Sequence, residues 1–401
     1  MKTVRIASQM PKKMGFRFVF QSVIRIFAAE KDCKGRLPSP GSSSGNVSII
    51  MSMEQRIIIS KNLQQELATA ISECEHDRLF VLVDETTRQA CWPLLRHFLC
   101  LKTAELITIG ASDTNKTLPT TAHVWQSLSQ GGATRHSLLI NLGGGMVTDL
   151  GGFAASTFKR GIDFINIPTT LLAMVDASVG GKTGINFEGL KNEIGVFSEP
   201  RFVILSTQFL QTLDHENLCS GYAEMLKHGL ISNDTMWAEL LNFNLAEPHF
   251  GQLQQMVADS VKVKENIVEA DPREKGIRKA LNLGHTFGHA FESMAMRQGQ
   301  PVLHGYAVAW GIVCELFLSA VKTAFPTQRM RQTVGFIRQH YGQPNITCDD
   351  YPELLELMRH DKKNIGNSIN FTLLGDIGDI RINQTATEEE IKEALDFIRE
   401  G

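Results

Sequence analysis

The chain has 401 residues, of which 43% are hydrophobic and 21% are charged, and its net charge is −3. This length suggests two domains, and the composition is that of a globular protein with a large core. Disordered, collagen-like and disulfide-stapled classes are excluded, and the charge argues against a protein built mainly to bind nucleic acid. No run of about eighteen uncharged apolar residues occurs, so we expect no membrane-spanning helix. The seven cysteines, none in a CxxC pair, indicate reduced thiols and a cytoplasmic protein.

The N-terminal region differs in charge from the rest of the chain. Residues 1–36 hold nine Lys and Arg against two acidic residues, a net charge of +7, which leaves −10 for the remainder. The run PSPGSSSGN at Pro38–Asn46 has the composition of a flexible linker. A targeting peptide is conceivable, but arginines interrupt the apolar part and no secretory cleavage pattern occurs. We therefore interpret residues 1–50 as a basic, disordered extension, or as upstream sequence translated ahead of Met51 or Met53.

From Glu54 onward, short apolar runs alternate with amphipathic stretches. Five runs are typical of buried strands: Leu79–Val83, Leu106–Ile109, Leu138–Asn141, Phe164–Ile167 and Phe202–Leu205. Helical spacing occurs at Ala122–Leu128 and at Leu63–Ile71, where Ser60 is the expected N-cap. Apolar strands separated by helices predict a parallel sheet covered on both faces. We therefore expect an α/β domain over residues 54–212.

Helical spacing dominates the chain after this domain. Six successive helices are expected, with prolines between some of them: Glu216–Leu230, Met236–Asn242, Leu253–Ala270, Ala280–Met296, Ala307–Thr323 and Gln328–His340. The sequence therefore predicts an all-α domain over residues 213–401.

Two glycine-rich runs could approach a phosphate. The first, GGGMVTD at Gly143–Asp149, follows an expected strand, where glycines let backbone N–H groups contact an anion. Its spacing is not GxGxxG, so nucleotide binding and a simple tight turn both stay open. The second run, GGKTG at Gly180–Gly184, contains Lys182. Asp176 stands where a Walker A motif needs its first glycine, which argues against ATP binding. Lys182 and Lys191 could still hold an anion as point charges.

His285 and His289 lie four residues apart in LNLGHTFGHAFES. On a helix they would share one face, which suits two metal ligands, although an isolated HxxxH pair is more often a hydrogen-bonded pair at a packed helix end. Arg278 and Asn282 precede His285 by seven and three residues and would lie on the same side of that helix. Other acid, base and imidazole groups occur on the expected helices: Glu224, Lys227 and His304. Spacing alone indicates a metal site made by His285, His289 and one further ligand.

Taken in order along the chain, these motifs resemble the 3-dehydroquinate synthase family. The resemblance runs from Gly143 to Lys227, through Arg278–Glu292 and into HGYAVA at His304–Ala309, and it extends over about residues 54–401. It implies a Rossmann-like NAD-binding domain followed by a helical metal-binding domain, and a homodimer. The implied reaction, a step of the shikimate pathway, converts the anionic 3-deoxy-D-arabino-heptulosonate 7-phosphate to 3-dehydroquinate and phosphate. NAD is recycled in it, and one divalent metal ion, zinc or cobalt, is required.

The resemblance also implies roles for individual residues. The implied metal ligands are Glu224, His285 and His304, which moves His289 to the substrate side. The implied NAD contacts are Asp84, Asp113, Lys116, Gly144, Gly145, Met146, Asp149, Thr169, Thr170, Asp176, Lys182, Lys191, Phe209, Leu210, Gln211 and Thr212. The implied substrate and catalytic residues are Asp176, Lys182, Lys191, Asn192, Lys227, Lys264, Arg278, Asn282, His289 and Lys363. Arg160 would reach into the partner subunit's site.

The implied substrate carries about three negative charges, so a cluster of cations is expected around it in this acidic chain. A buried cation without a charged partner is energetically costly. We therefore expect that these cations occur together because an anion binds between them. Three alternatives stay open: another sugar-phosphate cyclase, a metal-dependent polyol dehydrogenase, and a non-catalytic NAD- or metal-binding module. Four residues keep the 3-dehydroquinate synthase form and favour that family: Arg278, Leu281, Asn282 and His289.

Overall fold

The computed structural model describes residues 55–188, 190–360 and 369–400. All of the described residues belong to one compact unit. The predicted extension at residues 1–50 and the candidate substrate residue Lys363 lie outside the described residues.

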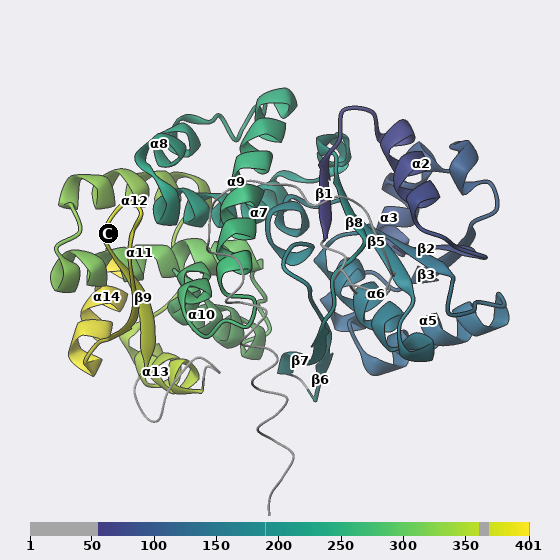
Figure 1. The fold of residues 1–401 in the computed structure, drawn as a ribbon. Coiled ribbons are helices and arrows are strands. Elements are labelled where there is room, and N and C mark those ends of the chain that lie inside the picture. Colours follow the sequence, from purple (N-terminus) through teal and green to yellow (C-terminus); the bar gives the residue numbers. More distant parts are fainter. Residues whose placement is uncertain (1–54, 189, 361–368, 401) are drawn as a thin grey trace, which may run out of the picture. The chain divides into compact units, whose positions relative to one another are not determined.

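A six-stranded parallel sheet forms the centre of the first half of the described chain (Figure 1). In spatial order its strands are β1 (Arg56–Ile59), β8 (Phe202–Leu205), β5 (Asp163–Pro168), β4 (Leu138–Gly143), β2 (Leu79–Asp84) and β3 (Glu105–Ile109). Every neighbouring pair runs parallel. The predicted parallel sheet and its five strands are confirmed, and the short strand β1 is an unpredicted addition at the edge.

Two apolar clusters, one on each face, hold helices against this sheet. The helices of this half are α2 (Leu63–Glu73), α3 (Glu85–Ala90), α4 (Trp92–Leu95), α5 (Leu118–Gln130) and α6 (Gly145–Thr157). Phe80 and Leu82 of β2 belong to the cluster with α5 and α6, whereas Val81 and Val83 belong to the cluster with α2. Successive residues of a strand point to opposite faces, so an uninterrupted apolar strand implies helices on both sides. Asn62, rather than the predicted Ser60, caps α2 by accepting a hydrogen bond from the Gln65 N–H.

The strand order reverses between β2 and β4. The chain passes from β2 outward to β3 on one side, and from β4 to β5 and β8 on the other. At such a reversal the loops after the two adjacent strands diverge and leave a crevice at their carboxyl ends. Asp84 ends β2 and Gly143 ends β4, so the sheet places both at this crevice.

An antiparallel hairpin of β6 (Lys182–Phe187) and β7 (Leu190–Phe197) follows the π-helical turn Ala173–Ala177. The sequence analysis did not predict it. β7 is exposed at all but one position, and Thr183 of β6 packs against Gly152 of α6. Polar residues and a glycine interrupt the apolar residues of β7 (LKNEIGVF), so it lacks the continuous apolar run that marks a buried strand, and its sequence gave no strand signal.

Among its described residues, the second half is helical apart from one antiparallel hairpin. Its helices are α7 (His215–Ser232), α8 (Asp234–Asn242), α9 (Phe250–Ala270), α10 (His285–Arg297), α11 (His304–Thr323), α12 (Thr327–Tyr341), α13 (Tyr351–Arg359) and α14 (Glu388–Glu400). The hairpin consists of β9 (Asn370–Asp376) and β10 (Asp379–Thr385) and packs against α11. The predicted order of an α/β half and a helical half is confirmed, with this hairpin as an addition to the all-α expectation.

The expected single helix over Ala280–Met296 is wrong. A 3₁₀ segment, Ile277–Asn282, ends before Gly284, whose φ of 80° is left-handed, and α10 begins at the next residue. Glycine adopts this conformation without the penalty of a Cβ atom. Arg278 and Asn282 therefore reach the site from a separate segment and do not share a helical face with His285.

Helix α11 approaches its neighbours at backbone distance. A Cβ atom added to Gly311 would lie 1.9 Å from the Gly284 carbonyl oxygen, and one added to Gly305 would lie 1.8 Å from the Ser220 carbonyl oxygen. Both approaches exclude any side chain. They bring the first residue of α11, His304, next to α7 and to the start of α10.

By length and composition α11 is apolar enough to cross a membrane, and 72% of that window is buried within the protein. The search for uncharged runs missed it because Glu315 and Lys322 lie inside it. Its contacts with α7, α10, α12, α14 and β9 are those of a core helix.

We predict that Gly311→Ala separates α10 from α11 and lowers the free energy of unfolding by at least 1–3 kcal/mol, roughly the cost of overpacking a core. Gly335→Ala on α12 is the matched control, because a Cβ atom there meets nothing within 4 Å. In the control, the higher helix propensity of alanine should be neutral or stabilising by up to about 1 kcal/mol. Urea unfolding of both variants measures this, and equal midpoints would contradict the close approach.

Candidate metal and substrate site

Three side chains from three helices converge in the helical half. Glu224 of α7, His285 of α10 and His304 of α11 each offer one ligand atom, and these atoms lie within 4.8 Å of one another. The Nε2 atoms of His285 and His304 lie 3.4 and 3.5 Å from Oε1 of Glu224. Glu224 has no solvent-exposed surface, and neither of its oxygens makes a hydrogen bond of good geometry.

The two histidine rings are oriented by their other nitrogens. Nδ1 of His285 lies 3.1 Å from the Leu283 carbonyl oxygen, and Nδ1 of His304 lies 3.2 Å from Oε2 of Glu292. A carbonyl and a carboxylate can only accept, so each Nδ1 carries a proton, and Nε2 is the nitrogen of each ring that faces Glu224. When both Nε2 atoms are deprotonated, two lone pairs and a carboxylate oxygen face one another, which suits a bound cation. This donor set fits zinc or cobalt, which take imidazole and carboxylate ligands.

The electrostatics of the cluster agree with a cation at this point. Burial opposes ionisation of Glu224, but the Lys227 ammonium and the His304 imidazole hold the pKa of its carboxyl well below the usual range. Burial also disfavours a charged His304, yet the nearby Glu224 and Glu292 carboxylates outweigh it and raise the pKa of His304 to about 10, so that without a metal ion a proton on Nε2 supplies the positive charge. A positive charge at this point is therefore strongly stabilised.

Glu315, which the sequence analysis did not single out, positions His285. It lies on α11 without solvent exposure, and its carboxylate accepts hydrogen bonds from the Gly284 N–H at 2.7 Å and the Thr286 N–H at 3.1 Å. These are backbone groups at the N-terminus of α10, which a carboxylate caps favourably. Glu315 thus fixes the turn from which His285 projects.

The candidate substrate lysines already have carboxylate partners. Four pairs are described: Lys182 with Glu274, Lys191 with Glu292, Lys264 with Asp176, and Lys227 with Glu224. Burial lowers the pKa of Lys264, and the Asp176 carboxylate opposes that shift. The expectation that these cations require an anion between them is therefore wrong for the protein alone, because its own carboxylates neutralise them.

Glu274 is a second residue that sequence reasoning missed. Its carboxylate pairs with Lys182 through Oε2 and accepts from the Asn282 amide at 3.0 Å through Oε1. Arg278, which is buried, donates to the carbonyl oxygens of Pro272 and Gly180. Three candidate substrate residues from both halves of the chain, Lys182, Arg278 and Asn282, are thus joined through this loop.

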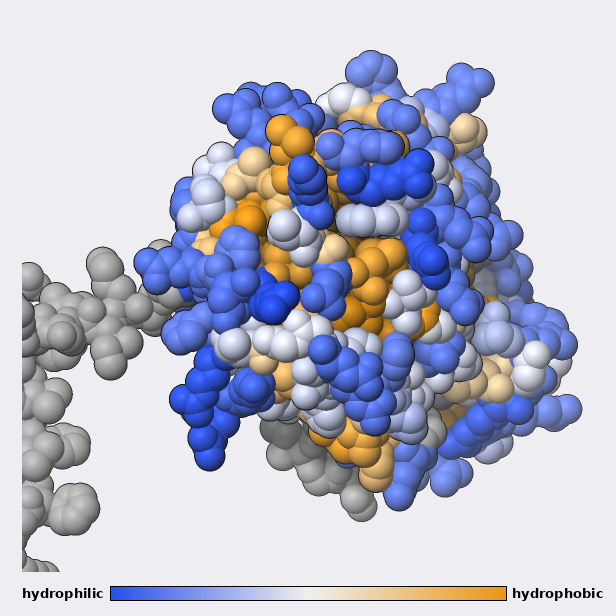
Figure 2. Space-filling model, turned by 90° about the vertical axis from the view of Figure 1, so that its right-hand side faces the viewer, coloured by the Kyte–Doolittle hydropathy of each residue, from blue (hydrophilic) through white to orange (hydrophobic). Residues whose placement is uncertain are grey.

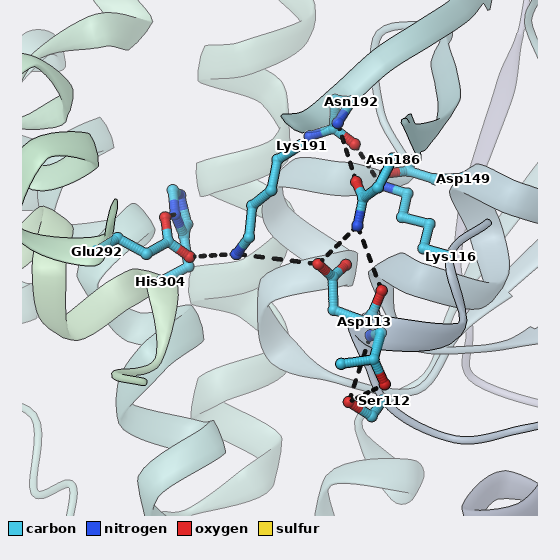
Figure 3. A network of polar contacts seen from close by, with 10 residues as sticks. Ser112, Asp113, Lys116, Asp149, Asn186, Lys191, Asn192, Glu292 and His304 are labelled. Carbon is cyan, nitrogen blue, oxygen red and sulfur yellow. Dashed lines mark hydrogen bonds and ion pairs between the residues drawn. The ribbon is translucent and has the colours of Figure 1, made fainter. Parts of the chain in front are cut away.

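A polar network connects the β6–β7 hairpin to the loop before α5 (Figure 3). Lys116 is buried and contacts both Asp149 of α6 and the Asn192 side chain. Asn186 donates to the Asp113 carboxylate at 3.0 Å and accepts from the Asn192 N–H at 2.9 Å. The candidate NAD contacts Asp113, Lys116 and Asp149 are therefore brought together, and each is bonded within the protein.

The glycine run lies where the sequence analysis expected it. Gly144 is the N-cap of α6, and Gly145 begins that helix, followed by the half-buried Met146. The Thr169 N–H bonds to the Gly143 carbonyl oxygen, and a Cβ atom on Gly144 would lie 3.0 Å from the Thr170 side chain. The N-terminus of α6 at the sheet reversal can bind an anionic group through its backbone N–H groups.

Other candidate NAD residues contribute differently from expectation. The Asp84 carboxylate caps α3 through the Thr87 N–H at 2.7 Å. Phe209 and Leu210 are 1% and 2% exposed, so only their backbone could face a cofactor, whereas Gln211 and Thr212 are exposed. These positions lie in the 3₁₀ segment Thr207–Thr212, directly before α7.

The spacing-based choice of His289 as a ligand is not what the geometry favours. Within the described ranges, the ligand cluster contains Glu224, His285 and His304 but not His289. The His289 ring lies 5.3 Å from that of His285 and 6.0 Å from that of His304, measured between centroids. His289 therefore lies beside the cluster, one helical turn farther along α10.

Comparison with known proteins identifies the family of this chain. Residues 106–220 match the family described as 3-dehydroquinate synthase N-terminal, and residues 221–364 match 3-dehydroquinate synthase C-terminal. The 3-dehydroquinate synthase of Parabacteroides distasonis is 52% identical over 348 residues, which cover 87% of this chain and 99% of the relative. The chain belongs to the 3-dehydroquinate synthase family. The 3-dehydroquinate synthase of Leptospira interrogans is 38% identical over 76% of this chain and 85% of its own length.

Two solved structures share the fold of this chain at low sequence identity. A 2-deoxy-scyllo-inosose synthase with carbaglucose-6-phosphate, NAD⁺ and Co²⁺ has a TM-score of 0.74 at 22% identity and covers 86% of this chain and 96% of its own. The 2-epi-5-epi-valiolone synthase of Streptomyces hygroscopicus with NAD⁺ and Zn²⁺ has a TM-score of 0.73 at 24% identity, and the match covers 91% of this chain and 99% of that synthase. The family resemblance and the fold predicted from the sequence are confirmed.

Arg160 is not among the described residues that converge at the site within a single chain. It is exposed on the turn Phe158–Arg160 after α6. Lys159 and Arg160 have φ values of 50° and 72°, so two successive non-glycine residues are left-handed. Such strain persists only where the surroundings impose it, which makes the turn a candidate functional feature.

His228, next to Lys227 on α7, is a fully buried imidazole. Its Nδ1 lies 2.7 Å from the Ser260 hydroxyl of α9, and its Nε2 makes no hydrogen bond with the described residues. Burial, together with the neighbouring Lys227 cation, lowers the pKa of His228 to about 3. The folded protein thus holds this histidine neutral.

We predict that His228 makes the fold acid-sensitive. Below its unfolded pKa of about 6.5 the unfolded chain takes up a proton that the folded chain refuses, so stability falls toward pH 3 by up to about 1.4 kcal/mol per pH unit. His228→Asn keeps an oxygen or nitrogen near the Nδ1 position and removes the titration. Urea unfolding between pH 7 and pH 4 should show a shallower loss for this variant than for the wild type, whatever its stability at pH 7. Parallel curves would refute the assignment.

Proposed function

We propose that the chain is a 3-dehydroquinate synthase that converts 3-deoxy-D-arabino-heptulosonate 7-phosphate to 3-dehydroquinate and phosphate. It would be a carbon–oxygen lyase that depends on NAD and one divalent metal ion, and it would act in the cytoplasm as part of the shikimate pathway. The convergence of Glu224, His285 and His304 beside cations from both halves carries this proposal. The 52% identity with a 3-dehydroquinate synthase over nearly its whole length supports it.

Glu224, His285 and His304 would hold the metal ion, and residues at the N-terminus of α6 would hold NAD. When bound, the metal supplies a Lewis acid for a substrate hydroxyl and NAD supplies a reversible hydride acceptor. Two neighbours bound to NAD⁺ and to Co²⁺ or Zn²⁺ have the same fold, which supports these cofactors. The carboxylate Glu224 and two neutral imidazoles leave room for a substrate oxygen as a further ligand.

The chain's own cations would bind the anionic groups of the substrate. Lys182, Lys264 and Arg278 would exchange their present partners for the substrate's carboxylate and phosphate. Exchange keeps each charge paired, so it avoids the cost of a buried unpaired cation. Asn192, Asn282 and Lys227 would orient the substrate, and Lys363 would add a further cation. His289, beside the metal cluster, and Lys191 would move protons near the departing phosphate.

The protein would work as a homodimer in which Arg160 reaches the partner subunit's site. Its exposure and left-handed backbone support a role beyond its own chain. Seven of the ten large apolar side chains that are exposed among the described residues lie in the α/β half: Leu94, Leu99, Leu118, Phe187, Leu190, Val196 and Phe197. Apolar residues also gather in a patch on the face of this half shown in Figure 2. Such surface is typical of an interaction face.

The fold alone does not separate a synthase from its rivals, because neighbours of this fold include cyclases for other substrates and a probable glycerol dehydrogenase at a TM-score of 0.53. Two observations favour the synthase. Arg278, Asn282 and His289 keep the form implied by the family resemblance, and paired cations would serve no purpose for an uncharged polyol.

A single assay tests the proposed function. Enzyme, NAD, metal and 3-deoxy-D-arabino-heptulosonate 7-phosphate should release phosphate without accumulation of NADH. Chelation of the metal should abolish turnover, and Glu224→Gln should lower kcat by at least about a thousandfold, since it removes the anionic ligand. NADH accumulation from polyols would instead indicate a dehydrogenase, and cofactor binding without turnover a non-catalytic module.

Subunit mixing tests the role of Arg160. Arg160→Ala and Glu224→Gln homodimers should each be nearly inactive. After mixing and subunit exchange, one site per heterodimer combines an intact metal cluster with an intact partner arginine. Activity should then recover to about a quarter of the wild-type value in a symmetric dimer. No recovery, although heterodimers form, would place Arg160 outside the partner's site.

A further inference from the structure

We propose that Glu292 is a positioning residue of the metal site. One of its carboxylate oxygens fixes the ring of His304, and the other fixes Lys191 of the β6–β7 hairpin. The inference rests on the metal site of the proposed function, and it assigns a role that neither motif spacing nor the family resemblance assigned.

Glu292 lies on α10, and its side chain is 10% exposed. Oε2 lies 3.2 Å from Nδ1 of His304 on α11, and Oε1 lies 2.6 Å from Nζ of Lys191 on β7. Figure 3 shows the carboxylate between these two groups, with the lysine reaching it from the hairpin. Both oxygens of one buried carboxylate are therefore committed to residues of the proposed site.

The contact with His304 decides which nitrogen can bind a metal. A carboxylate only accepts, so Nδ1 keeps its proton, and Nε2, which faces Glu224, is the nitrogen that a metal ion can bind in exchange for a proton. His285 obtains the same orientation from a backbone carbonyl two residues before it. His304 is the first residue of α11, and its side chain is 26% exposed. Its Nδ1 contacts no backbone carbonyl of the described residues in the same way, and the carboxylate of Glu292 on α10 orients its ring instead.

The contact with Lys191 joins the metal site to the cofactor half. Lys191 is 40% exposed, and its Nζ also lies 3.9 Å from the Asp113 carboxylate. Asp113 is in turn bonded to Asn186 of the same hairpin. A long lysine side chain loses much rotamer freedom when it is fixed, so a charged acceptor is needed to hold it. Glu292 thereby places a candidate proton-transfer group beside the ligand that it orients.

A purely structural ion pair would behave differently. It would stabilise the contact of α10 with α11 and the hairpin, and its loss would lower the unfolding midpoint without changing ligand geometry. A positioning residue controls the affinity for metal in the folded protein, and outer carboxylates on metal-binding histidines typically contribute about 10–100-fold.

The first experiment measures metal affinity of the full chain by competition with a chromogenic chelator. Glu292→Gln should weaken Zn²⁺ and Co²⁺ binding by about 10–100-fold and change the visible absorption spectrum of bound Co²⁺, because the amide can accept from only one of the two partners. Lys191→Met keeps the carboxylate on His304 and should stay within about threefold of the wild type. Glu353→Gln is the matched control, since Glu353 pairs with Arg297 on the exposed end of α10.

The second measurement separates the two contacts. At saturating metal, Glu292→Gln should recover most of kcat but keep a raised KM close to that of Lys191→Met. Glu292→Asp keeps the charge but cannot reach both partners, so it should also weaken metal binding. This variant replaces Glu292→Gln in both measurements if the glutamine variant does not fold.

The outcomes are distinguishable. A wild-type chain that binds no metal would overturn the proposed function and this inference with it. Wild-type metal affinity and an unchanged Co²⁺ spectrum in folded Glu292 variants would overturn this inference alone. Weakened binding in these variants, with Lys191→Met and Glu353→Gln unchanged, would establish it.

Discussion

A carboxylate without solvent exposure faces two imidazole nitrogens, and the helical half is arranged to keep it there. Burying the Glu224 charge is unfavourable unless positive charge lies close by, which Lys227 supplies on one side and the histidine cluster on the other. The close approach of Gly305 to α7 sets where His304 lies. Glu315 and the left-handed Gly284 set where His285 projects. Packing and capping thus bring together, at the junction of three helices, the three side chains that could hold a cation.

Charge pairs between the two halves bear on which substrate could bind. Lys182 and Lys191 of the hairpin pair with the helical-half carboxylates Glu274 and Glu292, and Lys264 of α9 pairs in the opposite direction with Asp176. A ligand that displaces these carboxylates must itself carry several negative charges, or it leaves cations unpaired in a low-dielectric site. We propose that selectivity for a sugar acid phosphate, with its carboxylate and phosphate groups, over a neutral polyol would follow from this exchange. The acidic net charge of the body is compatible with it, because the cations are concentrated where the exchange occurs.

The parts of the fold that the sequence predicted are those with strong periodicity. The buried strands are continuous apolar runs, and α7, α9 and α11 are long amphipathic or apolar stretches, so their spacing identified them. The β6–β7 hairpin escaped prediction because polar residues and glycines interrupt its apolar residues, so neither strand is a continuous apolar run. The break before α10 escaped because helical spacing continues through Gly284, where one left-handed residue redirects the chain.

Single carboxylates were the harder part of the site to predict. Glu274, Glu292 and Glu315 belong to no spaced motif, and each acquires its role only when another segment folds against it. Their sequence signal was at most a charged residue inside an otherwise apolar helix, as for Glu315 in α11. The resemblance to a known family supplied Glu224 and His304, which local spacing could not, because ligands from separate helices have no fixed separation along the chain.

The choice between His289 and His304 shows how packing overrides a local motif. Residues four apart on one helix can bind one ion only if a third ligand approaches that same face. Here the acidic ligand comes from α7, and α11 lies against α7 at backbone distance, so Glu224 faces the start of α11 and the start of α10 together. His289, one turn farther along α10, is left beside the cluster, where its ring faces both ligand histidines. An ion held by three helices whose contacts are already fixed by glycines and by Glu315 would find a preformed site, so metal binding here need not drive folding as it does in small zinc domains.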